Sequence, residues 1–281
     1  MSSEYLARLF QQRSQARIIR FDEQIVSLAG LDDLQLDLWE RFLTPRSRDE
    51  RDDFLAKLHM VRTDDEGTLR PTVAGVLMAS QDPRQWLPNA YIQAIFYRDV
   101  DILTDQSTAP YQLDAADITG PLDVQVVEAC RFVAKNMKVA AFKYMGRLDR
   151  PQFDMAAVFE AMVNAVAHRD YSIHGSKIRL RLFSDRLELY SPGSLPNTIS
   201  VEELAYLQSA RNEIITSLLA KCPVPPDEEW LTTDRRTMMY KRGEGVYIIM
   251  NNSERLSGRL PEYRLIGESE LMLTIWAANV S

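Results

Sequence analysis

The sequence is poor in cysteine and histidine, and this scarcity excludes several classes of protein. Its 281 residues include two cysteines, Cys130 and Cys222, and three histidines. Two cysteines are too few for a disulfide framework or a thiolate metal cluster, so we expect both to be small buried hydrophobes. His59 and His174 lack metal-ligand spacing and are expected at the surface. A reducing, cytoplasmic compartment is the corresponding expectation.

Long apolar runs and several catalytic signatures are also missing. No apolar run is long enough to span a bilayer, and the N-terminal stretch "MSSEYLARLFQQRSQARIIRF" has no apolar signal core, so no membrane partner is expected. The lack of a GxxxxGK[ST] loop excludes a RecA-type helicase motor. The lack of a nucleophile elbow argues against a Ser/His/Asp hydrolase. A net charge of −7 argues against a protein that coats nucleic acid.

The composition that remains is that of a globular protein, with 46% hydrophobic and 26% charged residues. We expect a polar tail or linker over 1–24, a mainly helical region over 25–88 and a second domain over 89–281. The helical region shows a helical pattern from Leu34 to Leu58, a turn at "TDDEGTLRP", and an apolar helix opened by Pro71. A winged-helix-like unit and plain helical packing both fit this order.

The second domain mixes strands and helices without a regular βαβ rhythm, which favours an α+β fold. Its first expected elements are a strand over 90–98, a helix over 121–137, a helix capped by Asp154, and two alternating strands around a Ser184-Asp185 turn. Two helices are expected next, over about 201–208 and 212–221, and the first of them starts with a Ser200/Glu203 capping box. A helix from "GEGVYIIMNN" and a closing hairpin end the domain.

A polar pair interrupts the apolar helix Met155–Ala167. Positions four apart are offset by roughly 40° on a helix, so Glu160, Asn164 and His168 share one face. A buried carboxylate is costly unless it has a partner, and the face therefore either meets solvent or lines a polar cleft. In a cleft, Asn164 could offer an amide oxygen to Mg²⁺, and Glu160 could activate a water near a phosphate.

The spacing Glu160-x-x-x-Asn164, followed by two strands and a glycine loop, resembles the N box of the GHKL (Bergerat-fold) ATPases. The stretches "EAMVNAVAHRDYSIHGSKIRLRLFSDRLELYSPGSLP", "SARNEIITSLLA" and "GEGVYIIM" are similar to one branch, the bacterial "RecG-related" ATP-dependent transcriptional regulators. The likeness covers the chain from about residue 89 onward. It implies a two-layer α/β sandwich that binds ATP and Mg²⁺, preceded by the mainly helical region.

The resemblance implies roles for individual residues. Glu160 matches the general base of members that hydrolyse ATP, and Asn164 matches the Mg²⁺ ligand. Gly243 and Gly245 match the second glycine box, where backbone N–H groups at a helix start meet phosphates. Lys241 would add positive charge there, as would Arg242.

Ser191-Pro192-Gly193 falls at the first glycine box, and here the sequence departs from the family. Relatives carry an Asp at the position of Ser191, and in the wider superfamily this Asp accepts a hydrogen bond from the adenine amino group. A serine hydroxyl cannot supply that fixed negative acceptor. The segment "GEG" is also short for a second glycine box. These departures keep two functions open: an ATP-controlled regulatory switch with slow or no hydrolysis, and a degenerate interaction module that has lost its ligand.

Two polar segments allow both structural and functional interpretations. His168-Arg169-Asp170 could complement the dipole of the helix C-terminus, or His168 and Arg169 could contact phosphate. Arg211-Asn212 could cap a helix or close a lid between the glycine boxes, over about 194–242. The resemblance further implies DNA as a partner through a Schlafen/Alba-like domain that this chain does not show, and it leaves a protein partner or a homo-oligomer open.

Overall fold

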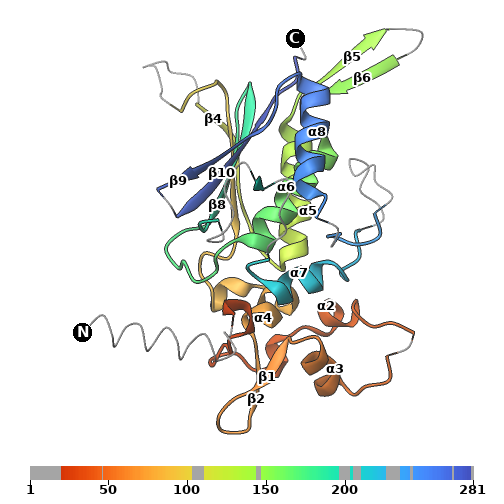
Figure 1. The fold of residues 1–281 in the computed structure, drawn as a ribbon, viewed down its shortest axis with the longest axis vertical. Coiled ribbons are helices and arrows are strands. Elements are labelled where there is room, and N and C mark those ends of the chain that lie inside the picture. The colour runs from red at the N-terminus through yellow and green to blue at the C-terminus, as the bar shows by residue number, and fades with distance from the viewer. Residues whose placement is uncertain are drawn as a thin grey trace.

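The computed structural model centres on a six-stranded mixed sheet (Figure 1). The structure describes residues 20–45, 47–102, 111–143, 147–195, 203–204, 210–225, 235–240, 243–267 and 269–279. The strands are β3 (Ile92–Tyr97), β4 (Gln112–Ile118), β7 (Ile178–Leu182), β8 (Arg186–Pro192), β9 (Glu262–Ile266) and β10 (Glu270–Trp276). They lie in the order β4-β3-β7-β8-β10-β9, and every neighbouring pair is antiparallel except β3 and β7.

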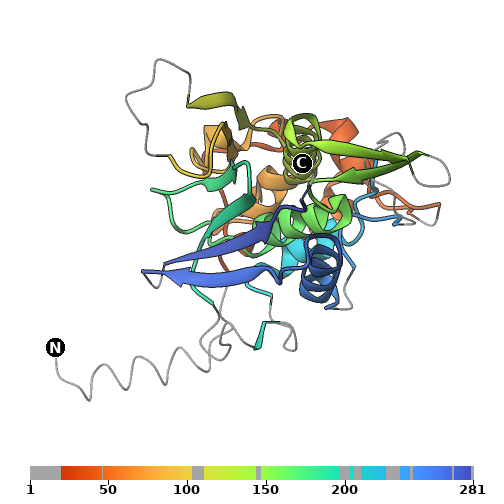
Figure 2. The ribbon, with the colours of Figure 1, turned by 90° about the horizontal axis from the view of Figure 1, so that it is seen from above.

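Three helices cover one face of this sheet: α5 (Leu122–Asn136), α6 (Met155–His168) and α8 (Gly245–Ser257) (Figures 1 and 2). Alternate residues of a strand point to the same face of the sheet. Leu180, Leu189 and Leu273 are cross-strand partners and all are buried. α6 contacts α5, α8 and β8 and so occupies the centre of the helical layer. The fold is therefore a two-layer α+β sandwich, as the sequence predicts.

α6 forms where the sequence places it. The Asp154 side chain accepts a hydrogen bond of 2.9 Å from the Ala157 N–H and caps the first turn. The helix is buried on nearly all sides because its neighbours lie on three sides of it. An apolar composition around the whole circumference is what such a position requires.

The N-terminal region adds α2 (Leu36–Glu40), α3 (Arg51–Lys57), the hairpin β1 (Val61–Thr63) and β2 (Leu69–Pro71), and α4 (Val73–Ala79). The segment expected as a plain turn is the connection of this hairpin. Pro71 ends β2 and does not open the helix, because Thr72 is the N-cap of α4 and accepts from the Gly75 N–H at 3.0 Å. The domain boundaries and the winged-helix-like unit stay predictions.

Other elements lie outside the predicted set or differ from it. The sequence analysis missed β4 and the hairpin of β5 (Val139–Lys143) and β6 (Arg147–Pro151), which projects beyond the end of the sandwich (Figure 1). α7 (Glu213–Leu219) confirms the second of the two helices expected after the first glycine box. The first of them, with its Ser200 cap, falls largely outside the described residues.

Cys130 and Cys222 are buried, as expected, and neither forms a disulfide. Among the described residues, no helix combines the length and the apolar character needed to cross a membrane.

Candidate functional site

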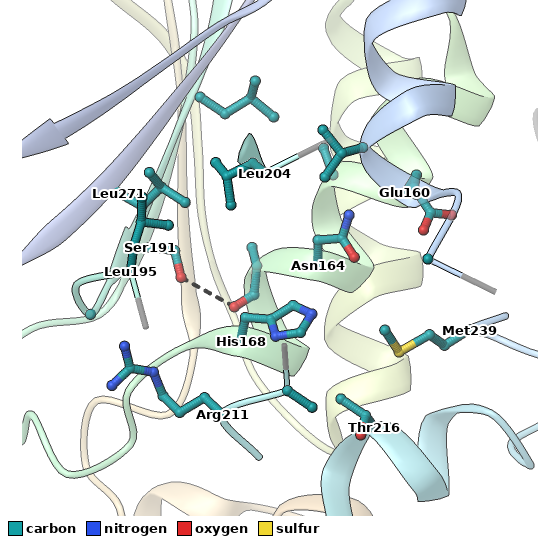
Figure 3. Close-up of a pocket in the computed structure, with 18 of the residues that line it drawn as sticks. Glu160, Asn164, His168, Ser191, Leu195, Leu204, Arg211, Thr216, Met239 and Leu271 are labelled. Atoms are coloured by element: carbon teal, nitrogen blue, oxygen red, sulfur yellow. Dashed lines mark hydrogen bonds between the residues drawn. The ribbon is translucent and has the colours of Figure 1, made fainter. Parts of the chain in front are cut away.

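A cavity of about 700 Å³ opens between α6, the strands β8 to β10, the start of α8 and α7 (Figure 3). This volume is within the range of small-molecule sites. Apolar side chains from β8 and β10 line one side, and polar groups from α6 line the other. The residues singled out in the sequence that line it are Glu160, Asn164, His168, Ser191, Gly193, Arg211, Gly243 and Gly245.

Glu160, Asn164 and His168 occupy one face of α6, and this face is turned into the cavity (Figure 3). The alternative of a stripe on open solvent is thereby wrong for Glu160, which is 3% exposed. The helical period alone placed these three side chains together. Their surroundings, by contrast, come from segments far away in the sequence.

Glu160 is paired with Arg235, which lies in the segment before α8. Both side chains are at least nine-tenths buried, at 4% and 9% exposed. Burial raises the pKa of the Glu160 carboxyl, and the charge of the Arg235 guanidinium opposes this shift. The ion pair supplies the partner that the buried carboxylate was expected to need, although Glu160 Oε2 makes no hydrogen bond among the described residues. Tyr263 of β9 also lines the cavity, and its phenol is buried near the same carboxylate.

Asn164 and His168 differ from Glu160 in their bonding. Within the described residues, neither side chain makes a hydrogen bond to protein, although both line the cavity. The pKa of His168 is lowered to about 4, first by burial and then by the nearby Arg211 charge. His168 is thus a neutral imidazole at pH 7. Polar groups of this kind at a cavity wall are groups that a ligand or water can satisfy.

The start of α8 closes the cavity beside Glu160 and Asn164. A Cβ on Gly245 would overlap Glu160 Oε1 and would lie 3.0 Å from Asn164 Nδ2. Glycine therefore lets the N-terminus of α8, with its free N–H groups, approach both side chains. Gly243 lines the cavity with a φ of 70°, a conformation that glycine adopts readily. Lys241 and Arg242 lie outside the described residues.

Ser191 lies near the end of β8, just before the first glycine loop, and lines the cavity on the side of the sheet. Its hydroxyl donates to the Ala165 carbonyl of α6 at 3.2 Å. The hydroxyl oxygen keeps its lone pairs and can still accept a hydrogen bond. Gly193 follows with a φ of 129°, and its N–H donates to the Ser269 carbonyl at 2.7 Å.

Arg169 does not line the cavity. Its guanidinium is buried, donates to the Ser176 carbonyl at 2.7 Å, and stacks over the Tyr171 ring at 4.7 Å from the centroid. Of the two residues expected to contact phosphate at this helix end, the structure brings His168 to the cavity and turns Arg169 away from it.

Arg211 and Asn212 connect the end of α6 to the loops around it. Arg211 pairs with Asp170 at 2.6 Å and donates to the Ser194 carbonyl after the first glycine loop. The Asn212 amide donates to the Ala167 and Arg169 carbonyls at 3.0 and 2.8 Å. Asn212 thus caps the C-terminus of α6, and its side chain makes no cap hydrogen bond to its own helix α7.

The N-terminal region supplies the cap of α7 that the Asn212 side chain does not provide. The buried Asp22 carboxylate accepts from the Ile214 N–H at 2.8 Å and from the Ile215 N–H at 3.2 Å, and so caps α7 from 192 residues away. His59, expected at the surface, is exposed and also lines the cavity, with a φ of 56°. No local sequence signal identifies these residues, or Arg235 and Tyr263, because their roles depend on long-range packing.

The described residues contain no group of three or more His, Cys, Asp or Glu side chains placed to hold a metal ion. Asn164 is the side chain that the sequence analysis assigns to Mg²⁺, and it would supply one oxygen. Mg²⁺ retains waters and shares substrate phosphates, so a single protein oxygen is compatible with such a site. The Asn164 side chain lines the cavity and makes no hydrogen bond within the described residues, so its amide oxygen is open to such a group.

Residues 175–275 match the family model described as "Putative ATP-dependent DNA helicase recG C-terminal". The matched region runs from the residues before β7 into β10. It includes Ser191, Gly193, Gly243 and Gly245, and it does not include the α6 residues Glu160 and Asn164.

Among solved structures, the chain is similar to the DIP2311 protein from Corynebacterium diphtheriae, with a TM-score of 0.64 and 19% identity over 96% of this chain and 49% of that one. This likeness shows the fold, and the chain spans about half the length of that protein. No curated protein matches the chain significantly. The family match supports an ATPase-like domain in the C-terminal part of the chain.

Proposed function

We propose that the cavity binds ATP together with Mg²⁺ and that this binding acts as the switch of a transcriptional regulator of the GHKL type, with slow or no hydrolysis. The observation that carries the proposal is the Asn164 amide, which faces the cavity without a hydrogen bond among the described residues, beside the glycine start of α8. A polar group left open next to a helix N-terminus suits a hydrated cation and the phosphates that share it.

Each wall has a part in this proposal. The Asn164 amide oxygen would hold Mg²⁺, whose chemistry is to neutralise phosphate charge. The N–H groups at the start of α8 would bind phosphate oxygens. The apolar side chains Leu189, Leu271 and Leu273 would pack against the base, whose edge Ser191 would meet. Glu160 would serve as the general base if hydrolysis occurs.

The wider role is proposed from the family likeness. A bound nucleotide would join α6, α8 and the first glycine loop, and so change the surface that a partner meets. DNA would be reached through a separate domain, and a protein partner or a second copy of the chain would respond to the nucleotide state.

Calorimetric titration with ATP, with and without Mg²⁺, tests the proposal. The wild type should bind ATP, and Mg²⁺ should tighten the binding. Asn164→Ala should lose the Mg²⁺ effect, by about tenfold or more in affinity. Asn251→Ala is the matched control, because Asn251 is exposed on α8. Glu160→Ala should bind ATP without hydrolysing it. A wild type that does not bind at millimolar ATP contradicts the proposal.

Ser191 favours a second candidate, a degenerate module that keeps the fold and has lost nucleotide binding. Its hydroxyl is already engaged by the Ala165 carbonyl, and no carboxylate stands in its place. A thermal shift separates the two candidates. Stabilisation by ATP but not by GTP supports the nucleotide switch, and no stabilisation by either nucleotide supports the degenerate module.

A further inference from the structure

Arg235 stands directly behind the cavity wall. It pairs with Glu160, and it is not among the described residues that line the cavity. Its guanidinium also lies over two aromatic rings, at 5.6 Å from the Phe159 centroid and 4.8 Å from the Tyr240 centroid. These contacts hold the cation beside Glu160, outside the residues that line the cavity.

The segment 235–240 is fixed by the end of α7 and the residues after it. The Val224 N–H donates to the Arg236 carbonyl at 3.2 Å, the Met238 N–H donates to the Cys222 carbonyl at 2.9 Å, and the Met239 N–H donates to the Leu219 carbonyl at 3.2 Å. Backbone hydrogen bonds thus determine where Arg235 emerges. A side chain held in this way presents its charge at a fixed place.

The charge balance at Glu160 explains why a cation is needed there. An unpaired carboxylate in a cavity for a polyphosphate would repel the ligand. The other described groups that face Glu160 are the Asn164 amide, the Tyr263 phenol and the N-terminus of α8, and none of these is a full positive charge. Arg211 is paired with Asp170 at the opposite end of α6. Among the described residues, Arg235 is therefore the counter-charge of Glu160.

We propose that Arg235 is a positioning residue of the nucleotide cavity, which neutralises Glu160 from behind and holds its carboxylate beside the start of α8, so that the phosphates of a nucleotide can enter. This inference rests on the proposed function and adds to it a residue that the family likeness does not assign. It makes phosphate binding, and not binding of the nucleoside, depend on the pair. The effect of removing the cation grows with the number of phosphates on the ligand.

The test compares adenosine, ADP and ATP on charge variants of the pair by calorimetry. Arg235→Gln leaves Glu160 uncompensated and should weaken ATP by about tenfold, ADP by less and adenosine by under about twofold. The double variant Glu160→Gln/Arg235→Gln is neutral and should return ATP to within about threefold of the wild type. Glu160→Gln keeps the Arg235 charge that the double variant lacks and should bind ATP more tightly than the double variant, with adenosine unchanged.

Each outcome decides between charge and structure. Equal weakening of adenosine and ATP in Arg235→Gln, or failure of the double variant to recover, would show a merely structural role and overturn the inference. Unchanged ATP affinity in Arg235→Gln also overturns it. If Arg235→Gln does not fold, the comparison of Glu160→Gln with the double variant still tests the charge effect. A wild type that binds none of the three ligands contradicts the proposed function itself.

Discussion

At the end of the cavity where we propose the base, the Ser191 hydroxyl donates a hydrogen bond to the Ala165 carbonyl. The hydroxyl oxygen can accept a hydrogen bond, but the serine side chain is short and uncharged. In contrast, Asn164 and His168 present polar atoms that no described protein group satisfies. If the cavity binds ATP as proposed, Asn164 and His168 are better prepared for a ligand than Ser191, and nucleotide selectivity should be weak.

Ser191→Asp should strengthen ATP binding and discriminate against GTP. The added carboxylate supplies a charged acceptor for the adenine amino group, and such a hydrogen bond contributes about 1–3 kcal/mol. Ser191→Asn is the matched control, since it has the same size without the charge. Competition binding with ATP and GTP measures the effect. Equal changes for ATP and GTP would show that this residue does not read the base.

His168 should make stability depend on pH. Its pKa in the folded protein is lowered to about 4, whereas an unfolded histidine titrates near 6.5. The unfolded state therefore binds more protons between these values, and stability is lost as pH falls through this window. The slope is at most about 1.4 kcal/mol per pH unit.

Urea unfolding from pH 7.5 to 4 measures this dependence. His168→Gln should remove the His168 contribution and so change the slope relative to the wild type, and the exposed His174→Gln should retain the wild-type slope. The pKa values of Glu160 and Asp22 are raised, so their contributions to the stability of the fold decrease as pH rises. These contributions are the same in all three proteins. A slope that survives unchanged in His168→Gln would contradict the assignment.

Among the elements of the N-terminal region, α4 packs directly against the sandwich. All seven of its residues are buried, and it contacts both α5 and α7. Gly75 allows α4 to lie against the Met60 backbone, where a Cβ would overlap the carbonyl oxygen and lie 2.9 Å from the carbonyl carbon. Backbone atoms on that side cannot move aside as a flexible side chain would.

Gly75→Ala should destabilise the protein by about 3 kcal/mol or more, because the backbone of one element must shift. Gly175→Ala is the matched control, since a Cβ there meets nothing within 4 Å. Chemical denaturation of both variants measures the difference. Equal stabilities would show that α4 and Met60 do not pack in this way.

Sequence patterns predicted elements well where local signals and packing agree. The alternation in "IRLRL" predicts a strand, and β7 forms there. The Asp154 cap predicts the start of a helix, and α6 begins directly after it. β4 was missed because "QLDAADI" has two Asp and two Ala, which are poor strand formers, and the strand exists through its pairing with β3. The period of α6 placed Glu160 and Asn164 on one face, but no local pattern could reveal Arg235, 75 residues away from Glu160.

In the whole molecule, the N-terminal region and the sandwich share one hydrophobic core. Residues from Ala29 to Ala79 belong to the same buried cluster as α5, α6 and the sheet. Asp22 adds a polar link, since it caps α7 beside the cavity. The boundary predicted between residues 88 and 89 therefore divides the sequence but not this hydrophobic core. We propose that the regions on both sides of it fold together.

Thermal and urea unfolding should accordingly show a single transition. In a Trp230→Phe/Trp276→Phe variant, Trp39 and Trp86 report on the N-terminal region by fluorescence, and far-ultraviolet circular dichroism reports on the whole chain. Coincident curves from both probes are expected for one cooperative unit. Two separate transitions would show that the regions unfold independently and that the shared core contributes little.

The most direct test of the central claim is a crystal structure of the protein with Mg²⁺ and a non-hydrolysable ATP analogue. The account predicts the metal on the Asn164 amide oxygen, the phosphates at the start of α8 beside Gly245, and the base between Ser191 and Leu271. A ligand bound elsewhere, or one whose phosphates point toward Ser191, would contradict the claim that this cavity is a nucleotide site.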